Sequence, residues 1–251
     1  MKLAHRLNQR VAPRKVSFAT DLQMISNHRI VFIDRKINGG LRNSFDSLVF
    51  RQRREALVVM ARVPSDMRGK SRLTRDLAGD HVELRRALLQ DTLDVVEGVA
   101  GVDVFIAFEP ADAIAEMRGL VGDGVRLFPQ QGDTLGERMR NAFERLFAAG
   151  YSGIVMIGSD LPSLPASHLA DAFHFVRERP DAVVIGPASD GGYYLIGMRR
   201  LCPELFTSST WSTSDVLATT TCIAESSGLT VSFISPWHDV DTIDDLRWKP
   251  R

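Results

Sequence analysis

Ile154-Val-Met-Ile-Gly-Ser-Asp160-Leu-Pro162 is the stretch of sequence that decides the fold. Its run of apolar, mostly β-branched residues predicts a buried strand of a parallel sheet. The strand must end near Gly158, because Pro162 cannot continue it. Asp160 then follows the carboxyl end of the strand, which is where open α/β sheets bind ligands. A carboxylate there suits Mg²⁺, which takes oxygen ligands. This stretch alone indicates a helix cap or a solvated loop aspartate equally well.

Strand-like and helix-like segments alternate along the chain from residue 56 onward. This alternation predicts an α/β, Rossmann-like domain with a mostly parallel mixed sheet and helices on both faces. We expect the domain to span residues 55–251. Apolar runs predict strands at residues 56–60, 103–108, 125–128, 181–185 and 230–234, and helical spacing predicts helices at residues 81–96, 110–120, 134–146, 163–176 and 215–227.

Polar residues before three of these helices predict their caps. Thr134 and Glu137 have the spacing of a capping box. Ser163 is the expected cap of the next helix, and Ser212 or Thr213 that of the helix after residue 215.

Charge is distributed unevenly along the 251 residues. Residues 1–54 hold 12 Lys and Arg against 3 Asp and Glu, and the rest of the chain is acidic. We expect residues 1–54 to be a basic, poorly ordered extension or to follow a start codon placed too far upstream; an arm for nucleic acid or a membrane surface is the alternative. An acidic body argues against nucleic-acid binding by the folded domain.

Composition also excludes several classes of protein. No apolar run approaches the roughly 20 residues that span a bilayer. Cys202 and Cys222 lie far apart without companion histidines, which argues against a disulfide framework or a zinc site. The cytoplasm is therefore the predicted location.

A glycine-containing basic loop, Gly69-Lys-Ser-Arg72, lies between the first predicted strand and helical sequence. Backbone N–H groups and basic side chains in this position can converge on a phosphate. The first glycine of a Walker A loop is absent, and a basic surface loop is the alternative interpretation.

Asp190-Gly191-Gly192-Tyr193 is a second candidate site. Two glycines allow the backbone to approach a ligand closely, and Asp190 can orient a hydroxyl or accept a proton. A simple turn into a strand is the alternative. Further along, Trp211 stands among three hydroxyl residues, and Asp239 and Asp241 follow the last predicted strand.

These motifs, in this order, resemble one family: the GT-A-fold, nucleotide-diphospho-sugar-transferase-like proteins. Members are known as arsenosugar-biosynthesis glycosyltransferases or radical-SAM-associated transferases, and molybdenum-cofactor and phospholactate guanylyltransferases are related. The resemblance covers residues 56–247. It is carried by Gly69-Lys-Ser-Arg-Leu73, Gln131-Gly-Asp-Thr-Leu-Gly-Glu-Arg-Met139, Gly158-Ser-Asp-Leu-Pro162, Asp190-Gly-Gly-Tyr-Tyr-Leu-Ile-Gly197, Trp211-Ser-Thr213 and Asp239-Val-Asp-Thr242.

The resemblance implies a nucleotide-binding GT-A domain and assigns roles by position. Asp160 would be the principal metal ligand and Asp241 the second, with Asp190 as the candidate base. The phosphates would be bound by Arg62, Gly69, Lys70 and Arg72, and the acceptor pocket would be shaped by Asp190, Gly191, Gly192, Tyr193 and Trp211.

The expected function is therefore that of a transferase dependent on Mg²⁺ or Mn²⁺, with a nucleotide-activated donor and a small-molecule acceptor. The resemblance favours a glycosyltransferase-like enzyme with a nucleotide-sugar donor. A nucleotidyltransferase that releases pyrophosphate would use the same site, since both reactions present a metal-bound diphosphate. A nucleotide-binding protein without turnover is the alternative from another class.

Overall fold

The structure, a computed structural model, describes residues 54–66, 81–207, 214–242 and 245. All of these lie in one compact unit, residues 50–251. The predicted basic extension lies outside the described residues except for Arg54, as do the predicted site residues Gly69, Lys70, Arg72 and Trp211. No helix in the described segments is both long and apolar enough to cross a bilayer.

The helices and strands alternate as the sequence predicts, with a further strand at residues 193–198. The elements are β1 (Glu55–Arg62), α2 (His81–Glu97), β2 (Asp103–Glu109), α3 (Ile114–Val121), β3 (Arg126–Pro129), α4 (Leu135–Ala148), β4 (Gly153–Gly158), α5 (Ala166–Glu178), β5 (Ala182–Pro187), β6 (Tyr193–Met198), the 3₁₀ turn η1 (Pro203–Phe206), α6 (Val216–Ser226) and β7 (Thr230–Phe233).

The strands form a seven-stranded mixed sheet in the order β3-β2-β1-β4-β6-β5-β7. All neighbouring pairs are parallel except those of β6, which runs antiparallel to β4 and β5. A short connection between β5 and β6 allows only antiparallel pairing, because a parallel crossover needs a dozen or more residues. The predicted mostly parallel mixed sheet is therefore confirmed.

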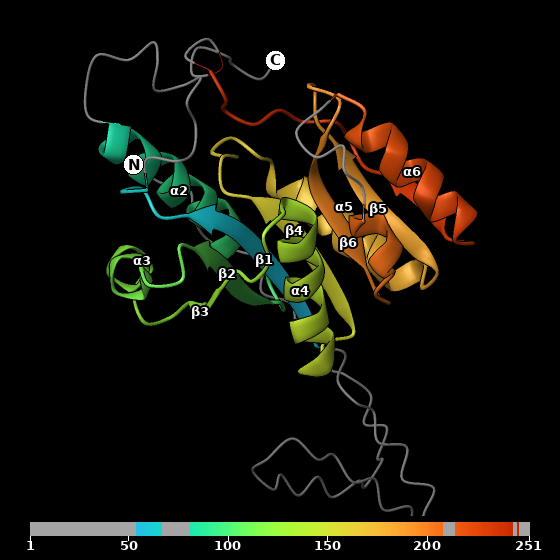
Figure 1. Ribbon diagram of the computed structural model, residues 1–251, viewed down its shortest axis with the longest axis horizontal. Coiled ribbons are helices and arrows are strands. Elements are labelled where there is room, and N and C mark those ends of the chain that lie inside the picture. Colours follow the sequence, from blue (N-terminus) through green and yellow to red (C-terminus); the bar gives the residue numbers. More distant parts are fainter. Residues whose placement is uncertain (1–53, 67–80, 208–213, 243–244, 246–251) are drawn as a thin grey trace, which may run out of the picture. The chain divides into compact units, whose positions relative to one another are not determined.

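Helices cover both faces of the sheet, as predicted (Figure 1). Alternate residues of β1 show why: Leu57 and Val59 pack in the core under α2, α3 and α5, whereas Ala56 and Val58 pack in the core under α4 and α6. Both sets are fully buried. The Rossmann-like class is thus set by central strands that are apolar on both sides.

The helix caps agree with the sequence in part. The capping box at α4 is confirmed: Glu137 N–H donates to Thr134 Oγ1 at 3.2 Å, and the Glu137 carboxylate accepts from Thr134 N–H. The Ser163 cap is wrong, because α5 starts later and Pro165 occupies its N-cap position. Asp215 occupies the N-cap position of α6, so the prediction of Ser212 or Thr213, which lie outside the described residues, is wrong as well.

Candidate active site

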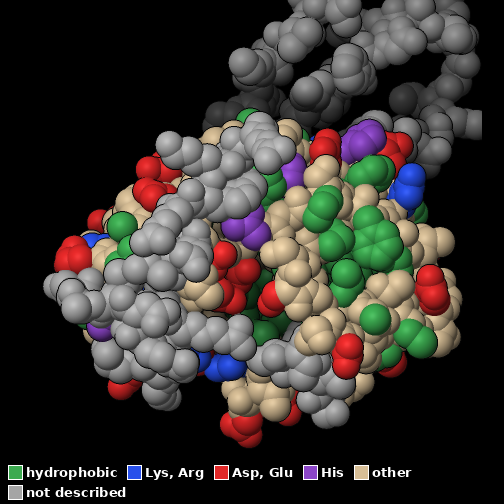
Figure 2. All heavy atoms as spheres, turned by 90° about the horizontal axis from the view of Figure 1, so that it is seen from above, with side chains coloured by type: hydrophobic (Ala, Val, Ile, Leu, Met, Phe, Trp, Pro, Cys, Tyr) green, Lys and Arg blue, Asp and Glu red, His purple; other side chains and the backbone are tan. Residues whose placement is uncertain are grey.

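A cavity of about 600 Å³ opens at the carboxyl edge of the sheet. Figure 2 shows acidic side chains gathered in a hollow of the upper face of Figure 1. The cavity is lined by the ends of β1, β2 and β4, by the start of β6, and by residues of α2, α4 and α6. Of the predicted site residues, Arg62, Asp160, Asp190, Gly192, Tyr193 and Asp241 line it.

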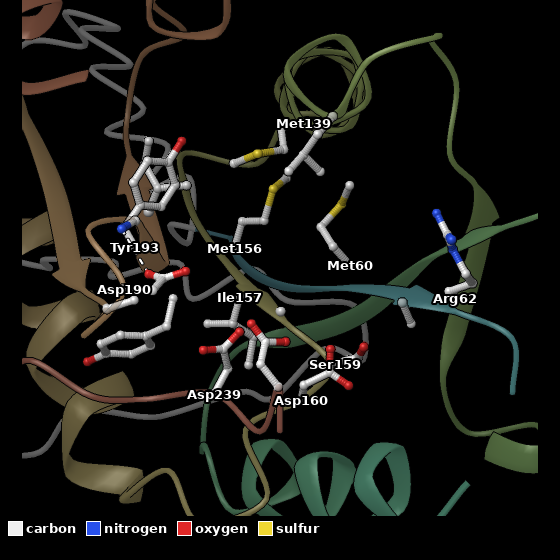
Figure 3. Close-up of a pocket in the computed structure, with 18 of the residues that line it drawn as sticks. Met60, Arg62, Met139, Met156, Ile157, Ser159, Asp160, Asp190, Tyr193 and Asp239 are labelled. Carbon is white, nitrogen blue, oxygen red and sulfur yellow. Dashed lines mark hydrogen bonds between the residues drawn. The ribbon is translucent and has the colours of Figure 1, made fainter. Parts of the chain in front are cut away.

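Asp160 and Asp239 lie side by side at the floor of the cavity, although 79 residues separate them in the sequence (Figure 3). The segment after β7 is held against the end of β4 by a backbone hydrogen bond from Val240 N–H to the Asp160 carbonyl, at 3.0 Å. Two carboxylates that approach in this way repel each other unless a cation or hydrogen-bond donors offset their charge. The floor is therefore suited to a cation.

Thr92, on α2, fixes the backbone on both sides of Asp160. Its hydroxyl is fully buried, accepts from Leu161 N–H at 3.1 Å, and lies 3.0 Å from the Ser159 carbonyl. The same hydroxyl lies 2.9 Å from the Leu88 carbonyl of its own helix. Thr92 is not among the site residues predicted from the sequence. Its hydroxyl anchors the turn that carries Asp160.

Asp241, the predicted second ligand, lines the cavity two residues beyond Asp239. Its backbone N–H donates to Asp245 Oδ2 at 3.0 Å, and both Thr242 N–H and the Thr242 hydroxyl donate to the same oxygen. Burial acts to raise the pKa of Asp245, but these hydrogen bonds outweigh it and hold the pKa below its usual value. A charged Asp245 thus holds the turn beside the cavity.

The Asp190 loop is fixed by its own backbone and by α6. Asp190 Oδ1 accepts from Gly192 N–H at 2.9 Å (Figure 3), and Gly191 accepts from Leu217 N–H at 3.0 Å. Gly191 has φ +89°, and a Cβ there would lie 2.3 Å from the Ser214 carbonyl oxygen. Only glycine fits this position. Gly191 therefore shapes the loop, while Asp190 and Gly192 line the cavity.

Tyr193 and Tyr194 diverge from this loop to opposite sides of the sheet. Burial raises the pKa of Tyr193, so its phenol stays neutral. In Figure 3 the Tyr193 hydroxyl points away from the aspartate pair, and the ring forms part of the wall. Tyr194 donates to the Ser235 carbonyl at 2.9 Å and lies 2.9 Å from His168 Nδ1. His168 is therefore a buried packing residue.

Methionines form an apolar wall above the acidic floor. Met60, Met139 and Met156 come from β1, α4 and β4 and lie between Tyr193 and Arg62 in Figure 3. Methionine is flexible and polarisable, so such a wall adapts to flat or irregular apolar groups and makes favourable contacts with rings.

Arg62 enters the cavity from the end of β1. It forms an ion pair with Glu109 at 2.5 Å and a longer one with Asp66 at 3.6 Å. The second oxygen of Glu109 accepts from Arg138, at the start of α4. Arg138 therefore pairs with a carboxylate of the site, whereas Glu137 caps its own helix.

Several lining residues were not predicted from the sequence. Arg85, on α2, is buried, and its guanidinium donates to the His81 and Asp66 carbonyls. Glu109 is the last residue of β2, and Gln130 is the first residue after β3. The rule that ligands bind beyond strand ends could have indicated both. Asp239 was noted in the sequence but not assigned as a ligand. Spacing alone did not distinguish it from Asp241.

The strand order and an acidic pocket at the carboxyl edge define the class of protein: an α/β domain of the Rossmann-like type, with its ligand pocket beyond the ends of the parallel strands. A protein from Desulfovibrio desulfuricans G20, described as a proposed nucleotide-diphospho-sugar transferase, is 32% identical; its structure gives a TM-score of 0.71, and the match covers 76% of this chain and 84% of that one. The chain therefore belongs to the nucleotide-diphospho-sugar transferase-like family, a family of transferases.

Two further comparisons give no activity for the chain. Residues 92–213 match the profile of the family described as an uncharacterized protein conserved in bacteria, DUF2064. No curated protein sequence matches.

Two nucleotidyltransferase structures share the fold. A CTP complex of CMP:2-keto-3-deoxy-manno-octonic acid synthetase is 14% identical with a TM-score of 0.53, covering 77% of this chain and 95% of that one. The 4-diphosphocytidyl-2C-methyl-D-erythritol synthase of Anaerococcus prevotii DSM 20548 is 11% identical with a TM-score of 0.53, covering 78% and 93%.

Proposed function

We propose that the protein transfers a group from a nucleotide-activated donor, a nucleotide sugar, to a small-molecule acceptor, and that the reaction depends on Mg²⁺ or Mn²⁺. The observation that carries the proposal is the pairing of Asp160 with Asp239 at the carboxyl edge of the sheet. A pair of carboxylates in this place is what a hard cation bridging protein and phosphate requires.

The donor set fits such a cation. In the described residues there is no group of three or more Asp, Glu, His or Cys side chains that could hold a metal. Two carboxylates are nevertheless sufficient for Mg²⁺, which keeps several waters and takes its other ligands from phosphates. When bound, the cation would neutralise charge on a departing diphosphate. Asp160 and Asp239 would hold it, and Asp241, which lines the same cavity, is our alternative second ligand.

The chain's own residues would bind and orient the substrates. Arg62, together with Gly69, Lys70 and Arg72 of the loop outside the described residues, would contact the donor's phosphates. Asp190 would orient the acceptor and take its proton, because Gly192 N–H holds one carboxylate oxygen in place and leaves the other to act as a base. The acceptor would lie against Gly192 and Tyr193, with Gly191 and Trp211 shaping the pocket.

Nucleotidyl transfer is the second candidate, since the same cation and carboxylates would serve a nucleoside triphosphate that releases pyrophosphate. We prefer glycosyl transfer because the 32% identical relative is described as a proposed nucleotide-diphospho-sugar transferase. The released product distinguishes the two reactions: a nucleoside diphosphate for glycosyl transfer and pyrophosphate for nucleotidyl transfer.

The test is a thermal-shift panel of nucleotides and nucleotide sugars, each with and without Mg²⁺ or Mn²⁺. A ligand at 100 times its Kd stabilises the folded state by about 2.7 kcal/mol. We expect a metal-dependent shift for at least one ligand. Asp160→Asn should abolish it, whereas Asp181→Asn, at an exposed carboxylate before β5, should not. A panel without any metal-dependent shift would contradict the proposal.

A further inference from the structure

Three side chains at the ends of β1, β2 and β3 form the end of the cavity that lies farthest along the sheet from β4. Arg62 of β1 lies opposite Glu109 of β2 in the parallel register. Phe108 lies opposite Pro129 of β3, so Gln130, the residue after Pro129, lies beside Glu109. Arg62, Glu109 and Gln130 all line the cavity. They form a row at the carboxyl edge that starts beside the aspartate pair and runs away from it.

The amide of Gln130 is held in one orientation. Its Nε2 donates to the Ala61 carbonyl at 3.0 Å and to the Ala107 carbonyl at 2.8 Å, which uses both amide hydrogens. A flipped amide would place Oε1 against two carbonyl oxygens, so the hydrogen bonds decide the assignment. Within the described segments no donor bonds to Gln130 Oε1. Gln130 therefore offers the cavity an acceptor and no donor.

Glu109 offers a second acceptor beside it. Its Oε1 accepts from Arg62 Nε at 3.0 Å and from Arg62 Nη2 at 2.5 Å, and its Oε2 accepts from Arg138. An ionised carboxylate has about four lone-pair sites, so Oε2 keeps one. Two guanidinium groups more than offset the charge of Glu109, which makes this acceptor compatible with the approach of an anionic nucleotide.

We propose that Gln130 and Glu109 recognise the base of the donor nucleotide, and that the base is guanine. Guanine presents two adjacent donors, N1–H and the N2 amino group, on its Watson–Crick edge. Adenine and cytosine place one amino group beside a ring acceptor, and uracil places its N–H between two carbonyls. Each of these three bases would place an acceptor atom against the side-chain oxygen of Gln130 or of Glu109. A site built to hydrogen-bond a donor strongly rejects a ligand that lacks it, because its polar groups are then left unpaired.

The distance along the row fits a nucleotide whose phosphates lie at the aspartate pair. The strands β4, β1, β2 and β3 are consecutive neighbours in the sheet. Three strand spacings amount to roughly 14 Å, which is comparable to the reach of a nucleotide from its phosphates to the far edge of its base. The phosphates would then lie over β4 and β1, and the base over β2 and β3. This inference rests on the proposed function, because it needs a nucleotide donor.

The first experiment changes only the ligand. Binding of GTP, GDP, ATP, CTP and UTP to the full chain is measured by calorimetry with Mn²⁺, and ITP and IDP are compared with the guanine nucleotides. Inosine nucleotides keep N1–H and lack only the 2-amino group. We expect guanine nucleotides to bind more tightly than the other common bases, and loss of the 2-amino group to weaken binding roughly 10- to 100-fold.

The second experiment changes only the protein. Gln130→Ala should bring the affinities for guanine and adenine nucleotides to within a few-fold of each other. The matched control is Gln131→Ala at the adjacent, exposed position, where only the backbone carbonyl is used, by Asn141. The control should keep the guanine preference. If Gln130→Ala fails to fold because two strand ends lose their shared donor, the inosine comparison decides alone.

Three results would overturn the inference. Metal-dependent binding of nucleotides with no preference for guanine, or with equal affinity for guanine and inosine nucleotides, would refute it and leave the proposed function standing. Absence of binding by every nucleotide would refute both. A guanine preference that survives Gln130→Ala in a folded protein would remove Gln130 from the account.

Discussion

Thr92→Val removes one buried hydroxyl and nearly preserves the shape of the side chain. In the structure this hydroxyl accepts from Leu161 N–H and faces the Ser159 carbonyl, so the variant leaves buried polar groups on both sides of Asp160 without this partner. A buried group left unsatisfied costs about 1–3 kcal/mol. In a domain of this size each kcal/mol lowers Tm by roughly 2–4 °C.

The same change should loosen the turn that carries Asp160 and so weaken metal binding. Loss of a residue that orients a metal ligand lowers metal affinity by about tenfold or more. We would measure Tm by calorimetry and Mn²⁺ affinity by titration in the presence of a bound nucleotide. Thr92→Ser, which keeps the hydroxyl, should restore Mn²⁺ affinity more than it restores Tm, because it still lacks the methyl group.

The matched control is Thr221→Val on α6. Among the described residues, Thr221 donates only to the Leu217 carbonyl of its own helix, at 2.8 Å, so its loss should have little effect on Tm and none on Mn²⁺ affinity. Wild-type stability and wild-type Mn²⁺ affinity in Thr92→Val would refute the reasoning that this hydroxyl anchors the site.

Two further predictions concern stability. Gly191→Ala should lower the urea midpoint more than Gly101→Ala, because both have positive φ but only the Cβ at residue 191 meets a backbone atom, the Ser214 carbonyl oxygen; equal midpoints would contradict this. Burial lowers the pKa of His168 in the folded protein, so at mildly acidic pH the unfolded chain binds more protons than the folded one. The contribution of His168 to the free energy of unfolding is therefore complete above the unfolded pKa of about 6.5 and is lost as the pH falls below it. His168→Asn, which keeps a donor facing Tyr194, should flatten the dependence of Tm on pH between about 5.5 and 7, and an unchanged slope would refute the assignment.

The central part of the fold followed from local sequence. The run at residues 154–157 is apolar on every side, which only a strand between two helical layers requires, and the structure buries it in both cores. The Ser163 cap failed because proline adopts the extended φ of an N-cap position without any side-chain bond, and Pro165 lies closer to the helix. Such competition between adjacent capping residues is decided by the path of the whole chain.

Several residues that line the cavity could be indicated from the sequence, but their arrangement in space could not. Asp160 and Asp190 stand directly after strands, so position in the sequence indicated them. The approach of Asp239 to Asp160 depends on a backbone bond between distant segments, which no local pattern encodes. The same holds for Glu109 and Gln130, which become neighbours only through the register of β2 and β3.

We propose above that Asp160 and Asp239 together hold a divalent cation. The most direct measurement is a Mn²⁺ titration followed by electron paramagnetic resonance, with the wild-type protein, Asp160→Asn, Asp239→Asn and the control Asp181→Asn, each in the presence of nucleotide. We expect one tight Mn²⁺ site in the wild type and the control, and loss of tight binding in both Asp160→Asn and Asp239→Asn. Wild-type Mn²⁺ affinity in a folded Asp160→Asn or Asp239→Asn protein would contradict it.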